Sequence, residues 1–153
     1  MLELKDFEAA YNKVQEVVLP TKLIKSDYFS DQTGNDVYLK PENMQLTGAY
    51  KIRGAYYKIS TLSEEEKAKG LITASAGNHA QGVALAAARQ GVKATIVMPT
   101  TTPLLKVNRT KDLGAEVILH GDVYDEAYAH ALDLAAEHGY TFVQPFDDPT
   151  VAT

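Results

Sequence analysis

Apolar and polar positions follow two different periods along this chain. Near the N-terminus, apolar residues recur three or four positions apart, which places them on one side of a helix. These residues are Leu4, Phe7, Tyr11, Val14 and Val18. Pro20 ends the predicted helix, and an irregular stretch continues to a turn signal in "TGND", residues 33–36. A short strand with the sequence "VYLK" is predicted at 37–40.

The middle of the chain predicts two short helices. The first follows "TGAY", residues 47–50, and ends near Ser60. The second begins at a capping box, in which Ser63 and Glu66 stand three positions apart, and Gly70 closes it.

From residue 71 onward, short apolar runs alternate with helical patterns. The predicted strands are 71–75, 94–98, 116–120 and 141–144. Helices are predicted at 78–89, from Thr102 and Pro103 to residue 114, and from a cap at Asp122 to residue 139. This alternation indicates an α/β fold, with a parallel sheet and helices on both of its faces. The loops after the strands would then share one edge of the sheet, where ligands bind in such folds.

Composition narrows the class of protein. The chain has 153 residues, of which 45% are hydrophobic and 23% charged, as expected for a globular fold. A net charge of −5 argues against binding to a nucleic acid. The absence of cysteine excludes disulfides, a thiol nucleophile and a cysteine-ligated zinc. The acidic N-terminus is unlike a secretion signal, and no apolar run reaches membrane-spanning length, so we expect a cytoplasmic protein that binds no membrane.

A turn of small residues is the first candidate for chemistry. Ser75 ends a predicted strand, Ala76 and Gly77 form the turn, and Asn78 opens a helix. Unpaired N–H groups at a helix start can bind a carboxylate or a phosphate, and Gly77 allows close approach. Ser75 and Asn78 could equally serve only to cap the helix, and the pattern leaves both interpretations open. The turn lacks the glycine spacing of a dinucleotide fingerprint or a P-loop.

Lys51 is the second candidate, because it stands among glycines and small apolar residues at a predicted helix start. The pattern alone leaves three interpretations open. Lys51 could be a surface lysine, a point charge that binds an anion, or an amine nucleophile that forms a Schiff base. Its neighbours favour a crowded, dry surrounding over an exposed one.

Other polar residues are assigned structural roles. His120, His130 and His138 lack the converging ligands of a metal site, so no metal is expected. Asp147 and Asp148 stand in a proline-flanked stretch typical of a turn. Arg53 lies two positions from Lys51, on a different side of the helix, and is expected to form a structural ion pair or hydrogen bond.

Two motifs together carry a resemblance to a known family. They are "KPENMQLTGAYKIRGA", residues 40–55, and "SAGNHAQG", residues 75–82. The chain resembles the fold-type II pyridoxal-phosphate (PLP) enzymes, whose fold is that of tryptophan synthase β, and among them the threonine and serine dehydratases. Shorter matches at 96–99, 113–117 and 145–149 extend the resemblance through most of the chain.

The resemblance implies a role for each matching residue. Lys51 would form the Schiff base with the cofactor, Tyr50 would pack near the cofactor ring, and Asn78 would hydrogen-bond the cofactor's phenolic oxygen. The substrate carboxylate would bind to the loop formed by Ser75, Ala76, Gly77, Asn78 and His79. This implied role agrees with the anion site that the helix start predicts.

Three departures from the family pattern qualify the resemblance. Ala76 replaces a serine that acts as an acid/base in the related serine racemases, which favours elimination over racemisation. Lys22 stands where many relatives have a proline. The glycine-rich loop that cradles the cofactor phosphate in the family has no counterpart within these 153 residues. We therefore expect residues 1–69 to be an incomplete piece of a large domain, 70–148 a small domain, and 149–153 the start of a return to the large domain.

The implied activity is β-elimination and deamination of L-threonine, and of L-serine, to 2-oxobutanoate (or pyruvate) and ammonia. The partners would be a small amino acid and further copies of the parent chain, and the resemblance does not separate isoleucine biosynthesis from catabolism. Two alternatives stay open. The chain could be a non-catalytic piece with a protease-sensitive N-terminal region, or a βαβ anion-binding module without PLP chemistry.

Overall fold

The computed structural model describes residues 2–153, which form eight α-helices and six strands. The helices are α1 (Leu4–Val14), α2 (Asp27–Thr33), α3 (Lys51–Ser60), α4 (Glu64–Lys69), α5 (Asn78–Arg89), α6 (Leu104–Asp112), α7 (Tyr124–His138) and α8 (Pro149–Ala152). The strands are β1 (Ile24–Lys25), β2 (Tyr38–Leu39), β3 (Leu71–Ala74), β4 (Ala94–Met98), β5 (Glu116–Leu119) and β6 (Thr141–Phe142), and a 3-10 helix covers Glu42–Met44.

A four-stranded parallel sheet organises residues 71–142. Its strand order is β5-β4-β3-β6, and each neighbouring pair is parallel. The central strands β3 and β4 are buried along their whole length, as expected for a sheet covered on both faces. The predicted strands and parallel sheet are therefore confirmed.

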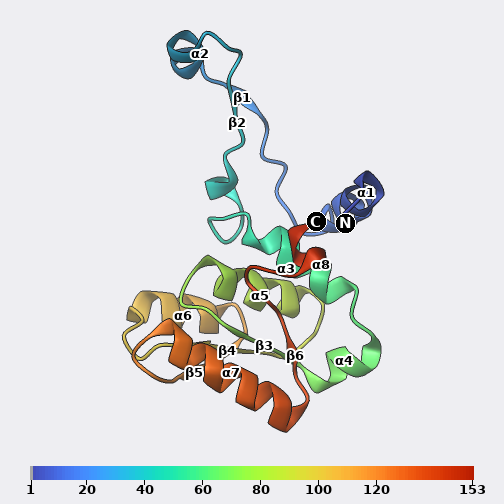
Figure 1. Cartoon of the computed structure of the whole chain (residues 1–153), viewed down its shortest axis with the longest axis vertical. Helices are drawn as coiled ribbons and strands as arrows, with labels where there is room; N and C mark the ends of the chain where they lie inside the picture. Colours follow the sequence, from blue (N-terminus) through green and yellow to red (C-terminus); the bar gives the residue numbers. More distant parts are fainter. Residues whose placement is uncertain (1) are drawn as a thin grey trace.

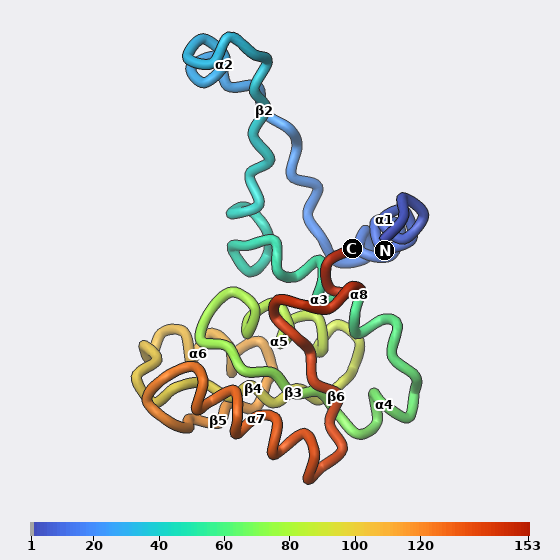
Figure 2. The backbone as a smooth tube through the Cα atoms, in the orientation of Figure 1, coloured from blue at the N-terminus to red at the C-terminus, as the bar shows by residue number. Residues whose placement is uncertain are grey.

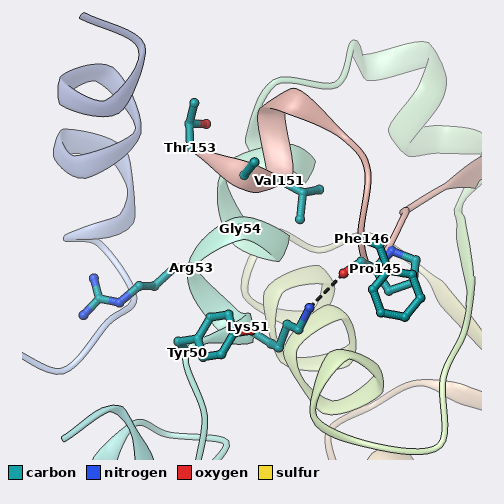
Figure 3. Close-up of a pocket in the computed structure, with 9 residues that line it drawn as sticks. Tyr50, Lys51, Arg53, Gly54, Pro145, Phe146, Val151 and Thr153 are labelled. Atoms are coloured by element: carbon teal, nitrogen blue, oxygen red, sulfur yellow. Dashed lines mark hydrogen bonds between the residues drawn. The ribbon is translucent and has the colours of Figure 1, made fainter. Parts of the chain in front are cut away.

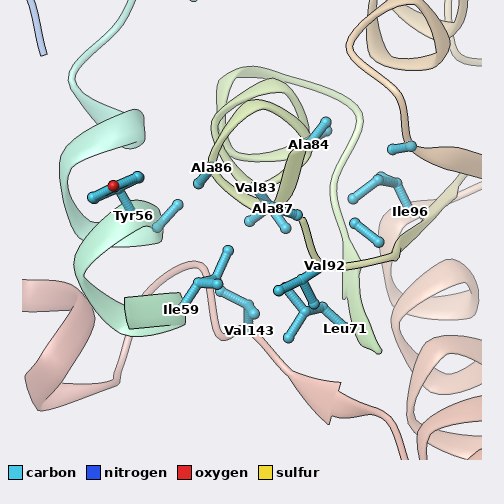
Figure 4. Close-up of a cluster of buried hydrophobic side chains, with 14 of the residues drawn as sticks. Tyr56, Ile59, Leu71, Val83, Ala84, Ala86, Ala87, Val92, Ile96 and Val143 are labelled. Carbon is cyan, nitrogen blue, oxygen red and sulfur yellow. The ribbon is translucent and has the colours of Figure 1, made fainter. Parts of the chain in front are cut away.

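Helices cover both faces of the sheet (Figure 1). The larger apolar core lies between the sheet and helices α3, α5 and α6 (Figure 4). A second core joins the other face to α7, through Ile72 and Val97 on the strands and Ala127 and Ala131 on the helix. Leu71 faces the first core and Ile72 the second, as the alternation of side chains along a strand requires.

The segment between Pro20 and "VYLK" was predicted to be irregular, and this prediction was wrong. Strands β1 and β2 pair antiparallel and carry α2 between them, as an arm that extends away from the sheet (Figure 2). Ser26 caps α2 by accepting a hydrogen bond from Phe29 N, and Gly34 ends it in the left-handed conformation, at φ 67°. Both signals were present in the sequence, but the helix is too short to show a period.

The first helix also differs from its prediction. It ends at Val14 rather than near Val18. Val14 is buried, whereas Leu4 and Tyr11 are 73% and 62% exposed. The helical spacing was correct, but the buried residues of α1 are Ala10 and Val14, and most of its apolar residues stay exposed.

Two predicted helix starts need correction. Pro103, not Thr102, occupies the N-cap of α6, and the buried Thr102 hydroxyl has no hydrogen-bond partner within residues 2–153. Asp122 does not cap α7; instead Glu126 accepts hydrogen bonds from the main-chain N–H groups of Asp122 and Val123. Residues 149–152 form α8, a short helix that is not among the predicted elements. No helix in residues 2–153 is long and apolar enough to cross a membrane.

Candidate active site

Lys51 is the first residue of α3, as the sequence predicts. Its Nζ donates a hydrogen bond of 2.8 Å to the main-chain oxygen of Pro145, which is 94 positions later in the chain. The two residues line a cavity of about 300 Å³, which Figure 3 shows between α3 and the C-terminal segment. The cavity is also lined by Tyr50, Arg53, Gly54, Phe146, Val151, Ala152 and Thr153.

Two aromatic rings flank the Lys51 amine. Its Nζ lies 5.5 Å from the ring centre of Tyr50 and 5.7 Å from that of Phe146. Both distances allow an attraction between the ammonium and the ring face. Lys51 is half-buried, whereas Tyr50 is 58% exposed and Phe146 is 74% exposed. The predicted crowded, dry surrounding is thus only partly present, because no described residue covers the outer side of the two rings.

Glycine 82 brings the Lys51 backbone against α5. A Cβ at Gly82 would lie 3.0 Å from the carbonyl carbon of Lys51 and 3.1 Å from Ile52 N. A side chain at this position would require the α3 backbone to shift by a few tenths of an ångström, since so close a Cβ contact is rare. A glycine within a helix costs about 1 kcal/mol relative to alanine. Gly82 in α5 is explained by the close approach of the first residues of α3.

The loop from Ser75 to Asn78 connects β3 to α5 as predicted, but neither side chain caps the helix. Gly77 occupies the N-cap, and its lack of a side chain leaves the first turn of α5 without a side-chain cap. The Ser75 hydroxyl instead accepts a hydrogen bond from Gly77 N within the turn, at 3.2 Å. A Cβ built on Gly77 would meet no atom within 4 Å. The turn is therefore open toward its outer side, and the N–H groups of the first turn remain free to bind an anion.

Lys51 and the loop lie at the same end of α5. The Lys51 backbone contacts Gly82, which is four residues, or roughly 6 Å along the helix axis, from Asn78. Residues 75–79 do not line the Lys51 cavity itself. Tyr50 lies beside Lys51, and Asn78 is exposed at the loop. The structure thus places the Lys51 backbone near the predicted anion site, on neighbouring helix starts.

His79 differs from the other loop residues, because its side chain turns inward. Its exposed fraction is 4%, and Nε2 lies 3.1 Å from the main-chain oxygen of Val143. Burial lowers the pKa of His79 to about 4, the hydrogen bond to Val143 opposes this, and the charge of Lys51 lowers it further. The imidazole is therefore neutral near pH 7 and faces away from the loop, so only the main-chain N–H of His79 can serve an anion.

Arg53 forms the structural ion pair that the sequence predicts, and its partner is Glu42. Nε and one terminal nitrogen of Arg53 each donate to a different oxygen of Glu42, both at 2.8 Å. Thr21 donates to the same carboxylate at 2.6 Å. Arg53 is the main cause that lowers the pKa of Glu42, to about 2. Figure 3 shows Arg53 pointing away from Lys51.

Three of the remaining candidates make contacts within the described chain. No group of three metal-binding side chains is found among residues 2–153. His120 and His130 stack with their ring centres 3.9 Å apart. Asp148, predicted to form a turn, caps α8 through Thr150 N and also pairs with Lys58 at 2.7 Å.

Two groups beside the Lys51 amine were not predicted from the sequence. The main-chain oxygen of Pro145 accepts a hydrogen bond from the amine, and the ring of Phe146 flanks it. A contact to a main-chain oxygen cannot be recognised from a pattern of side chains. Gly82 carried a usable signal, because a glycine inside a helix indicates close packing.

Comparison with known proteins identifies the family. Residues 14–153 match the family described as pyridoxal-phosphate dependent enzymes. The chain belongs to this family.

The most similar relatives include threonine ammonia-lyases. The chain is 53% identical to the L-threonine ammonia-lyase of Thermotoga maritima over 151 residues, which are 99% of the chain and 38% of the relative. The processed threonine deaminase isoform 2 of Solanum lycopersicum superposes with a TM-score of 0.90 at 45% identity, over 96% of the chain and 43% of that structure. Maize serine racemase superposes with a TM-score of 0.91 at 30% identity, over 97% and 45%. The chain therefore spans less than half the length of these relatives.

The residues around Lys51 fit the family's cofactor by their chemistry. PLP carries an aldehyde, and Lys51 provides the primary amine that such an aldehyde requires, in a cavity beside two aromatic rings. The free N–H groups at the start of α5 suit the carboxylate of an amino acid.

Proposed function

We propose that this chain supplies the PLP-binding lysine and the substrate-carboxylate site of a lyase that deaminates L-threonine and L-serine. The proposal is carried by one observation. The Lys51 amine lies in a cavity at a helix start, and its backbone abuts α5 about one turn from the uncapped loop 75–79. The high identity to threonine ammonia-lyases supports threonine as the substrate.

Lys51 would hold the cofactor covalently and later act as the base. PLP, when bound, withdraws the electrons released at the α-carbon of the amino acid. The Lys51 amine would then be free to act as the general base that takes the α-proton of the bound amino acid. Its flanking rings, Tyr50 and Phe146, restrict the directions in which the amine can swing.

The loop 75–79 would orient the substrate by its carboxylate. The first-turn N–H groups of α5, including that of His79, donate to the carboxylate, and the helix dipole favours its negative charge. The Ser75 hydroxyl is available to donate to the carboxylate while it accepts from Gly77 N. Asn78, exposed at the end of the loop, is proposed to contact the cofactor.

Elimination is proposed rather than racemisation. The methyl side chain of Ala76 can neither donate nor accept a proton, so the loop offers no acid/base at that position. The fold alone does not decide between the two reactions, because a serine racemase superposes as well as a threonine deaminase does.

Several finer expectations accompany this proposal. A cytoplasmic location, a homo-oligomeric parent and a place in isoleucine biosynthesis stay predictions. The division into a large domain and a small one at residue 70 also stays a prediction. The α3 helix, on the proposed large-domain side, shares one apolar core with α5 and the sheet.

The test is a titration of the purified chain with PLP, followed by its visible absorbance. A yellow band is expected for the chain and for the Lys106→Ala variant, in which a lysine exposed on α6 is removed. The band should be lost in Lys51→Ala. A band that survives Lys51→Ala contradicts the assignment of Lys51.

A second arm tests the reaction itself. The PLP-loaded chain is mixed with L-threonine, and 2-oxobutanoate is measured. Formation of 2-oxobutanoate shows that the chain alone suffices. A yellow band without 2-oxobutanoate means that residues outside this chain are required. The absence of both favours the two alternatives, a non-catalytic piece or an anion-binding module without PLP chemistry.

A further inference from the structure

Three hydrogen bonds converge on Val143, the residue that follows β6. Its main-chain N–H donates to Ile72 O at 2.9 Å. Its main-chain oxygen accepts from the Thr73 hydroxyl at 2.8 Å and from His79 Nε2 at 3.1 Å. Two buried side chains, from β3 and from α5, thus hold one carbonyl.

The side chains of Thr73 and His79 bind the main chain just beyond the end of the β3–β6 pairing. Strands β3 and β6 pair at only two positions, which end at Ile72 and Phe142. Val143 is fully buried, with its side chain in the larger core beside Ile59 and Leu71 (Figure 4). A buried carbonyl oxygen without a hydrogen-bond donor is unfavourable. Thr73 and His79 provide donors for the Val143 oxygen, which lies beyond the paired residues of β6.

The bond to Val143 fixes the protonation of His79. A carbonyl oxygen can only accept, so Nε2 must carry the hydrogen, and Nδ1 is the unprotonated nitrogen. Nδ1 is buried and has no partner within residues 2–153. A second proton there would be a buried donor without an acceptor, close to the charge of Lys51. The imidazole is therefore held as one neutral tautomer.

The held carbonyl stands two residues before the one that binds Lys51. Within the described chain, no main-chain N–H from 144 to 148 donates to another main-chain oxygen. The position of Pro145 thus depends on Val143 and on the 3.3 Å hydrogen bond from Gln144 Nε2 to the Tyr128 hydroxyl on one side. On the other side it depends on Asp148, whose carboxylate is held by Lys58 and the start of α8. Between these anchors, the Pro145 oxygen binds the Lys51 amine and the Phe146 ring flanks it.

We propose that Thr73 and His79 are positioning residues for Lys51. They hold Val143 and thereby place the Pro145 oxygen that aims the amine, although neither side chain is in hydrogen-bond contact with the amine. The inference rests on the proposed function in that it treats Lys51 as the reactive lysine. It adds a buried hydroxyl and an imidazole, acting through the main chain, to the residues on which the reactivity of that lysine depends.

The test measures the reactivity of Lys51 in the chain without cofactor. Each lysine is labelled with a trace of acetic anhydride, and the rates are compared by mass spectrometry, with Lys106 as the internal reference. Thr73→Val and His79→Leu remove the donors while keeping much of the side-chain shape. Thr73→Ser and His79→Gln keep a donor for the Val143 oxygen. Val83→Ala is the matched control, since Val83 is buried in α5 one turn after His79 but makes no hydrogen bond to Val143.

Loss of either donor should free the amine from the Pro145 oxygen. The Lys51 rate is expected to rise about three- to tenfold relative to Lys106 in Thr73→Val and in His79→Leu, as for the loss of one hydrogen bond. Thr73→Ser and His79→Gln should restore the original ratio, and Val83→Ala should leave it unchanged. An unchanged ratio in Thr73→Val, or an equal rise in Val83→Ala, would overturn the proposal.

A second measurement does not depend on any variant. Nitrogen NMR of the imidazole should show His79 protonated at Nε2 and not at Nδ1, and the opposite tautomer would overturn the proposal. The two proposals can also fail separately. Failure of PLP to attach to Lys51 removes the proposed function, whereas failure of the labelling ratio to change removes only the positioning role.

Discussion

His79 should make this protein less stable in mild acid. The imidazole is buried, and its pKa is lowered from the ordinary 6.5 to about 4, first of all by burial. Between these two pH values the unfolded chain binds a proton that the folded chain does not. Stability from this group is therefore fully present above pH 6.5 and is lost as the pH falls toward 4.

The size of the loss follows from the two pKa values. Their difference of about 2.5 corresponds to roughly 3 kcal/mol when the whole range is crossed. At about pH 5 the unfolded residue is almost fully protonated and the folded one only about a tenth, so the loss there is about 2 kcal/mol.

Urea unfolding at about pH 7.5 and about pH 5 measures this loss. His79→Gln is the matched variant, because it keeps a donor for Val143 but cannot titrate. Every other titrating group is common to both proteins, so the difference between their pH dependences isolates His79. The free energy of unfolding of the original chain should fall by about 2 kcal/mol more than that of His79→Gln. Equal pH dependence in the two proteins would refute the burial of a neutral His79.

Three further predictions concern the ion pair, the helix contact and the arm. Glu42→Gln should lower the free energy of unfolding by about 1–3 kcal/mol, because Arg53 is left partly buried with a neutral partner. In the original chain, the stability that the Arg53–Glu42 pair contributes should be lost as the pH falls from 4.5 toward 2. Glu65→Gln, at an exposed pair with Lys69, should leave the urea midpoint unchanged, and equal effects of the two variants would contradict this assignment. Gly82→Ala should lower the urea midpoint despite its better helix propensity, since its Cβ would press on the Lys51 carbonyl; a raised midpoint would show that the contact is not tight. Trypsin should cut first within residues 20–40, where the arm stands away from the sheet (Figure 2), and first cuts within residues 71–142 would contradict the described packing.

The region from residue 71 to residue 142 could be predicted closely from the sequence. Buried strands such as 94–98 are continuous apolar runs, and the helices between them end at glycines, so two independent signals agree. The arm could not be predicted in the same way. Its strands have two residues each and its helix seven, which is too short for a period to appear.

In the candidate site, too, some features could be predicted from local sequence patterns and others could not. The positions of Lys51 and of the loop 75–79 followed from local patterns, and the ion-pair role of Arg53 followed from its place on the helix. The partner of Arg53 and the contact to Pro145 could not be predicted, because they join segments that are distant in sequence. The buried position of the His79 side chain could not be predicted either, because its partner is the main-chain oxygen of Val143, which no side-chain pattern reveals.

The central claim is that Lys51 is the residue to which PLP attaches. The purified chain is incubated with PLP, reduced with borohydride to make any lysine adduct permanent, digested and mapped by mass spectrometry. We predict that the cofactor mass is found on the peptide that contains Lys51, well above its level on exposed lysines such as Lys93 and Lys106. A label spread evenly over the lysines, or concentrated on another one, would contradict the account.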